Sequence, residues 1–146
     1  MTDVDHRPFA VQTFNACWDI LEKKGAAAED YRELLTLAFT SRWHWGFEGG
    51  LDQWITGDWM ISRAASLYGD HTLALDFIDR AWTALSPESP DWLRASIAEG
   101  QARAAILAGK HDLFTTWVAR ARELVAAIAQ DDDRAVIAGQ LSEIDS

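Results

Sequence analysis

Tyr68-Gly69-Asp70-His71 lies between two stretches in which apolar residues recur every three or four positions. Ala108-Gly109-Lys110-His111 lies between two more such stretches, forty residues later. The same offset of forty pairs Arg63 with Arg103. A glycine between two segments of helical periodicity is typical of a helix end followed by a second helix. The sequence therefore predicts two successive helical hairpins of the same kind.

Outward from these two turns, the same periodicity divides the rest of the chain into helices. The alternation of apolar and polar residues that marks a strand is nearly absent. We expect seven helices, at about 8–24, 27–48, 51–68, 72–85, 91–108, 113–128 and 131–144. Gly57 and Asp58 lie inside the third segment and weaken the prediction there. The prediction is an all-α single domain over residues 1–146, built of stacked antiparallel hairpins with a C-terminal capping helix.

The predicted hairpins resemble the tetratricopeptide repeat. That family has a glycine at the turn, an alanine early in the second helix, a large residue four positions on, and a second alanine three beyond that. Gly69, Ala74, Ile78 and Ala81 fit this frame. The period of forty departs from the family's period of about 34, so the chain is interpreted as an irregular, tetratricopeptide-like α-solenoid fragment. The segment 41–45 is also similar to one in uncharacterised bacterial helical proteins.

The composition disfavours several classes of function. A net charge of −10 and a pI of about 4.6 create a field that repels nucleic acids and anionic membranes. The residues before Phe9 lack the apolar stretch of a signal peptide, and no run approaches 18 apolar residues. One cysteine, Cys17, cannot form an internal disulfide. We therefore expect a cytoplasmic protein that binds neither nucleic acid nor a membrane.

No cofactor or metal is predicted. The sequence has no nucleotide-binding glycine loop and no Ser-His-Asp order of the hydrolase type. The four histidines lack the short ligand spacings of a metal site. Asp131, Asp132 and Asp133 are interpreted as a favourable start to the last helix, where negative charge suits the helix dipole.

The tetratricopeptide resemblance implies a concave groove lined by the first helix of each hairpin. The family's groove positions fall on Trp59, Arg63 and Ser66 in one unit, and on Ser96, Glu99, Arg103 and Ile106 in the next. Two neighbouring guanidinium groups can bind a carboxylate or phosphate through paired hydrogen bonds. The leading hypothesis is a non-enzymatic binding module that holds an acidic peptide, a carboxylate or a small anion. The alternative is a set of salt bridges, Arg103 with Glu99 and Arg63 with Asp70 or Glu99.

The segment Arg42-Trp43-His44-Trp45 is a second candidate for the groove. If the second helix ends beside the groove, His44 meets Trp59 and Arg63, and Arg42 and Trp45 join the binding residues. A histidine there could transfer a proton near neutral pH. The alternative is a hydrogen-bonded histidine at a helix end.

Two further functions remain open at this point. In one, the protein is a small-molecule enzyme or ligand carrier, in which His44 and Glu99 transfer protons. Its apolar pocket is formed by Trp43, Trp45, Trp54 and Trp59. In the other, it is a self-associating structural protein such as a homodimer, which would expose Trp92 or Trp117 on an outer face.

Overall fold

A computed structural model describes residues 4–145 of the chain. Over these residues it contains seven α-helices and no strand, so the all-α prediction is confirmed. The helices are α1 His6–Leu21, α2 Ala28–Glu48, α3 Leu51–Tyr68, α4 His71–Ala84, α5 Asp91–Leu107, α6 His111–Ala126 and α7 Asp131–Ile144. Each begins and ends within a few residues of its predicted position.

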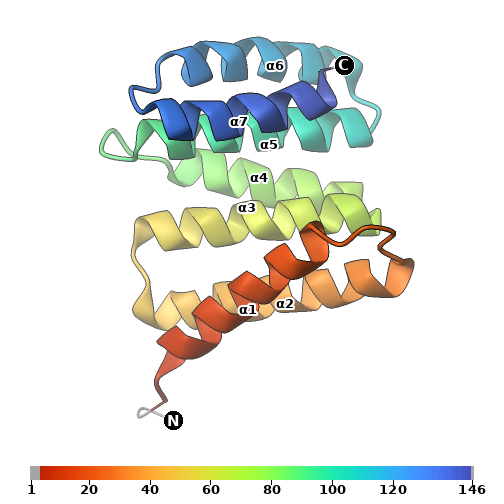
Figure 1. Ribbon diagram of the computed structural model, residues 1–146, viewed down its shortest axis with the longest axis vertical. Helices are drawn as coiled ribbons and strands as arrows, with labels where there is room; N and C mark the ends of the chain where they lie inside the picture. The colour runs from red at the N-terminus through yellow and green to blue at the C-terminus, as the bar shows by residue number, and fades with distance from the viewer. Residues whose placement is uncertain (1–3, 146) are drawn as a thin grey trace.

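The helices form a stack in which each helix packs on the next one in the chain. In addition, α3 contacts α5, and α5 contacts α7. Figure 1 shows α1 crossing in front of α2, and α7 lying in front of α5. The odd-numbered helices therefore come together on one side of the stack, with α3 and α5 between α1 and α7.

The two hairpin turns share two backbone features. Gly69 has φ 102° and Gly109 has φ 74°, both in the left-handed region that favours glycine. After Gly69, the amide of Asp70 donates to the carbonyl of Ala65 at 2.9 Å. Forty positions on, the amide of Lys110 donates to the carbonyl of Ala105, also at 2.9 Å. The offset found in the sequence is thus a repeat of the backbone hydrogen bonds that end these helices.

The first helix begins two residues earlier than predicted. The carboxylate of Asp5 accepts a hydrogen bond from the amide of Arg7 and so caps α1. Pro8 is then the third helical residue rather than the first. A proline is tolerated there because the first-turn amides of a helix have no partner in the helix.

Gly57 and Asp58 do not interrupt α3, which runs unbroken from Leu51 to Tyr68. A Cβ atom added at Gly57 would lie only 2.6 Å from Cδ of Arg42 on α2. The glycine therefore provides the space for the Arg42 side chain between α2 and α3, and it is a packing feature rather than a helix break.

The largest hydrophobic core lies around α3 and its neighbours. Its fully buried members include Leu34, Ile55, Met60, Ile61, Ile78 and Ile97. Because the apolar residues are gathered on buried helix faces and separated by polar ones, no helix in residues 4–145 is long and apolar enough to cross a membrane.

Candidate functional site

A long depression lies between the odd-numbered helices. Its inner hollow has a volume of about 320 Å³ and is lined from α1, α3, α5 and α7. The lining residues are Phe14, Trp18, Thr56, Trp59, Trp92, Leu93, Ser96, Asp133, Val136, Ile137 and Gln140. An outer hollow of about 310 Å³ shares Phe14, Thr56 and Trp92 with it, and adds Trp45, Asp52 and Gln53. We call the two hollows together the aromatic trough.

Helical spacing explains how each helix presents its residues to the trough. Residues three or four apart lie on one face of a helix. Phe14 and Trp18 are four apart on α1, and Trp92 and Ser96 are four apart on α5. On α7, the lining residues that follow Asp133 are Val136, Ile137 and Gln140, which lie three, four and seven positions after it. Each helix thus exposes one continuous stripe to the same depression.

The aromatic residues form both the floor and the edge of the trough. Trp59 is buried, and its ring lies 5.9 Å from that of Trp18, at an angle of 32° between the planes. Trp92 retains 39% of its surface exposed, and Val136 on the opposite wall retains 60%. The trough is therefore open to solvent along its edge, while its floor is apolar.

Arg63 and Arg103 lie close together, as the offset of forty predicts. Both line a small cavity, of about 10 Å³, together with Trp59, Ser62, Ser66 and Gly100. Burial and the neighbouring charge of Arg103 lower the pKa of Arg63, while Glu99 and Glu143 act in the opposite direction. A cavity of this size holds about one water molecule, so it does not admit a carboxylate or a phosphate.

Arg103 is held by carboxylates of the chain itself. Its Nε donates to Oε1 of Glu99 at 2.9 Å, and its Nη2 lies 2.6 Å from the same oxygen. Nη2 also donates to the carbonyl of Gln140 and to Glu143, each at 3.2 Å. The salt bridge between Arg103 and Glu99 is therefore present, and α7 covers the groove face of Arg103. The hypothesis of an open arginine pair is wrong for this half of the pair.

Arg63 has a different environment. Its guanidinium carbon lies 5.9 Å from the centroid of the Trp59 ring, within the range of a cation–π contact. Nη1 of Arg63 and Oε2 of Glu99 are both buried without a hydrogen-bond partner among the described residues. Neither of the salt bridges considered for Arg63, with Asp70 or with Glu99, is formed within residues 4–145. Arg63 thus lies against Trp59 in the small cavity and lines neither hollow of the trough.

His44 does not reach the predicted groove. Its Nδ1 lies 2.9 Å from Nδ1 of His6, and its ring stacks on Phe9 at 5.3 Å. Burial and the charge of His6 lower the pKa of His44. The side chain packs α2 against the start of α1, whereas Glu99 lies on α5 against Arg103. The predicted proton-transfer pair of His44 and Glu99 is therefore not assembled.

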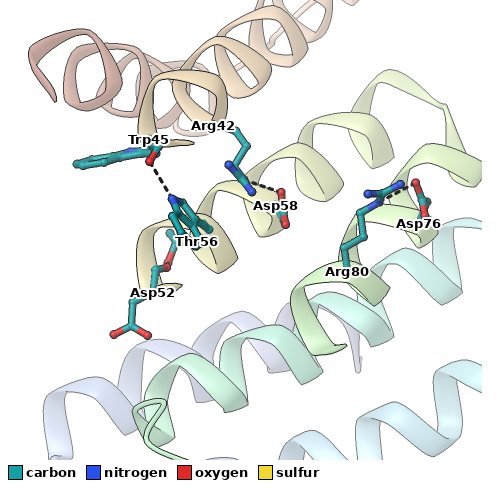
Figure 2. Close-up of polar contacts among 8 residues, drawn as sticks. Arg42, Trp45, Asp52, Thr56, Asp58, Asp76 and Arg80 are labelled. Carbon is teal, nitrogen blue, oxygen red and sulfur yellow. Dashed lines mark hydrogen bonds and ion pairs between the residues drawn. The ribbon is translucent and has the colours of Figure 1, made fainter. Parts of the chain in front are cut away.

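Arg42 and Trp45 have separate places. Nε of Arg42 donates to Oδ1 of Asp58 at 2.9 Å, an ion pair between α2 and α3 that Figure 2 shows. Burial raises the pKa of Asp58, against the opposing effect of Arg42. Trp45 lines the outer hollow, and its carbonyl accepts from Nε1 of Trp54 at 2.8 Å. Of these two residues, only Trp45 belongs to the trough.

The tryptophans named for self-association do not form an outer patch. Trp92 lines the trough. Trp117 is partly buried and packs edge-on against Trp82, with ring centroids 4.8 Å apart.

Ser96 was predicted as a groove position and lines the trough. Several other trough residues were not predicted, although the sequence held a signal for some of them. The offset of forty pairs Asp52 with Trp92, Gln53 with Leu93, and Thr56 with Ser96, and all six residues line the trough. The repeat that aligned the arginines thus also aligns the residues that α3 and α5 contribute to the trough. Phe14 and Trp18 on α1 and the stripe on α7 lie outside the repeat and had no such signal.

No protein-family model, curated protein or solved structure matches this chain. The described residues also include no group of three or more His, Cys, Asp or Glu side chains that could hold a metal ion. The site is therefore defined by the shape and chemistry of the aromatic trough.

Proposed function

We propose that this protein is a binding module whose aromatic trough holds an apolar side chain of a partner peptide. The observation that carries the proposal is the inner hollow, in which Trp18, Trp59 and Trp92 from three helices surround about 320 Å³. Large apolar side chains that enter such a concave surface supply most of the binding energy of many peptide complexes. This proposal keeps the concave groove of the tetratricopeptide-like interpretation and replaces the anionic ligand with an apolar one.

The open edge of the trough favours a peptide over a fully enclosed ligand. Enclosed sites bury most of a small molecule, whereas Trp92 and Val136 remain exposed along this edge. The inner and outer hollows share three lining residues. An extended segment could therefore occupy both hollows and place successive anchors along the trough.

The test compares two variants that each carry one added tryptophan, the first inside the trough and the second on the outer face of the molecule. Ser96→Trp on α5 adds a large side chain inside the inner hollow. Thr116→Trp adds the same side chain at an exposed position on α6 outside the trough. A library of random displayed peptides is selected on the unaltered protein. Binding of the selected peptides to both variants is then measured.

We expect the selected peptides to share an apolar anchor, to lose binding to Ser96→Trp, and to retain it with Thr116→Trp. Circular dichroism checks that both variants keep the helix content of the unaltered protein. If no peptide is enriched, or if the enriched peptides bind Ser96→Trp as well as the unaltered protein, the trough is not a peptide site.

A carrier of small apolar molecules is the second candidate function. The volume of the inner hollow favours it, because about 320 Å³ falls at the lower end of small-molecule sites, which span about 300–1,000 Å³. Native mass spectrometry of the purified protein distinguishes the two. A retained compound that is lost in Ser96→Trp supports the carrier, and a bare protein supports the peptide module.

A further inference from the structure

The trough contains carboxylates without a basic partner. Asp52 lines the outer hollow and Asp133 lines the inner hollow. Neither forms an ion pair within residues 4–145, whereas Asp58 nearby is bound to Arg42. Figure 2 shows the Asp52 side chain directed away from that ion pair. Among the lining residues there is no lysine, arginine or histidine. The charge lining the trough is thus entirely negative.

Trp92 lines both hollows, and it therefore shares one hollow with Asp52 and the other with Asp133. The face of an indole attracts a guanidinium or ammonium group. Two other tryptophans of the trough already attract guanidinium groups of this chain. Arg7 lies 5.3 Å from the ring centroid of Trp45, and Arg63 lies 5.9 Å from that of Trp59. Trp92, which is 39% exposed, has no such cation among the described residues.

We infer that the trough selects a basic segment of a partner peptide, in which an arginine or lysine lies next to the apolar anchor. The anchor occupies the inner hollow. The cationic group lies on Trp92, within the field of Asp52 and Asp133. The net charge of −10 adds a long-range attraction for such a segment. The inference rests on the proposed function, since it concerns the ligand of the same trough.

The experiment uses three nine-residue probe peptides. Each has one central tryptophan, flanked by four arginines, four glutamines or four glutamates. Binding to the ¹⁵N-labelled full chain is followed by NMR, in which the indole N–H signals report on each tryptophan separately. We expect the arginine peptide to bind about tenfold tighter than the glutamine peptide. The glutamate peptide should bind more weakly still.

Variants that remove negative charges test whether Asp52 and Asp133 cause the preference for the arginine peptide. In the double variant Asp52→Asn, Asp133→Asn, the arginine peptide should lose most of its advantage over the glutamine peptide. The double variant Asp112→Asn, Asp132→Asn is the matched control. It removes two charges, from the first turns of α6 and α7, at exposed residues that do not line the trough. The advantage should be kept in this control, and it should shrink as salt is raised because exposed charges are screened.

The outcomes separate this inference from the proposed function. If all three peptides bind equally and all lose binding to Ser96→Trp, the trough is a peptide site without charge preference, and only the present inference fails. If the glutamate peptide binds best, the ligand is acidic and the inference is overturned. If none of the peptides binds, both the inference and the peptide module are overturned.

Discussion

Glu99 and Glu143 bind the same guanidinium group in very different surroundings. The side chain of Glu99 is fully buried, and that of Glu143 is 62% exposed. Removal of one partner from a buried ion pair leaves an uncompensated charge in a poorly solvated place. An exposed pair contributes little because water screens it. Glu99 and Glu143 therefore allow the stability contributions of a buried and an exposed glutamate, paired with the same arginine, to be compared.

We expect Glu99→Gln to lower the free energy of unfolding by about 3 kcal/mol. Glu143→Gln should lower it by less than about 1 kcal/mol. Both substitutions keep the shape of the side chain and remove one negative charge near Arg103. Equilibrium urea unfolding measures the two effects. Equal losses would show that the burial of Glu99 does not determine the strength of its pairing.

Some contacts of individual site residues could be predicted from the sequence, and others could not. The closeness of Arg63 and Arg103 follows from the repeat. The occupation of Arg103 by Gln140 and Glu143 does not, because it depends on where α7 packs. The contact of His44 with His6 joins residues 38 apart in the chain and belongs to no repeat. Local patterns therefore predicted neighbours within the repeat and missed partners outside it.

At the scale of the helices, two glycines lie beside the same arginine. A Cβ atom added at Gly57 of α3 would lie 2.6 Å from Cδ of Arg42, which is too close for any real contact. A Cβ atom added at Gly46 of α2 would lie 3.7 Å from Nη1 of Arg42, an ordinary van der Waals distance. Packing between α2 and α3 thus requires glycine at the first position and tolerates alanine at the second.

Gly46→Ala should therefore stabilise the protein, by up to about 1 kcal/mol, because alanine favours the helix. Gly57→Ala should destabilise it by about 1–3 kcal/mol, because the added atom forces Arg42 and the α2–α3 contact to shift. Thermal unfolding of the two variants gives the signs directly. Stabilisation by Gly57→Ala would mean that Arg42 has room to move at no cost.

The helices themselves were largely predictable. Periodicity identified all seven, and the glycines at 69 and 109 marked the hairpin turns. The exact starts depend on caps such as Asp5, which acts through one hydrogen bond to Arg7. Gly57 was interpreted as a weakness of the helix because propensity alone does not reveal a neighbouring side chain. A glycine in a helix has two opposite meanings, and only the packing distinguishes them.

At the scale of the whole molecule, the repeat predicts which residues α3 and α5 contribute to the trough, and it does not predict the walls. The pairs 52 and 92, 53 and 93, and 56 and 96 follow from one offset along α3 and α5. The walls come from α1 and α7, which share no such repeat. Their positions depend on contacts such as that of Trp18 with Trp59, between residues 41 apart. Long-range packing of this kind leaves no periodic trace in the sequence.

Cys17, the single thiol of the chain, lies fully buried on α1, between Phe14 and Trp18 in the sequence. Burial raises its pKa to about 12, so at neutral pH almost none of it is the reactive thiolate. A thiol reagent can therefore modify the closed molecule only when α1 lifts from its neighbours. The rate at which Cys17 is modified therefore measures how often α1, one wall of the trough, separates from its neighbours. A ligand bound in the trough should lower the rate of Cys17 modification. A stopped-flow assay with a chromogenic disulfide measures this rate. Modification as fast as that of an unfolded peptide would mean that α1 is rarely closed.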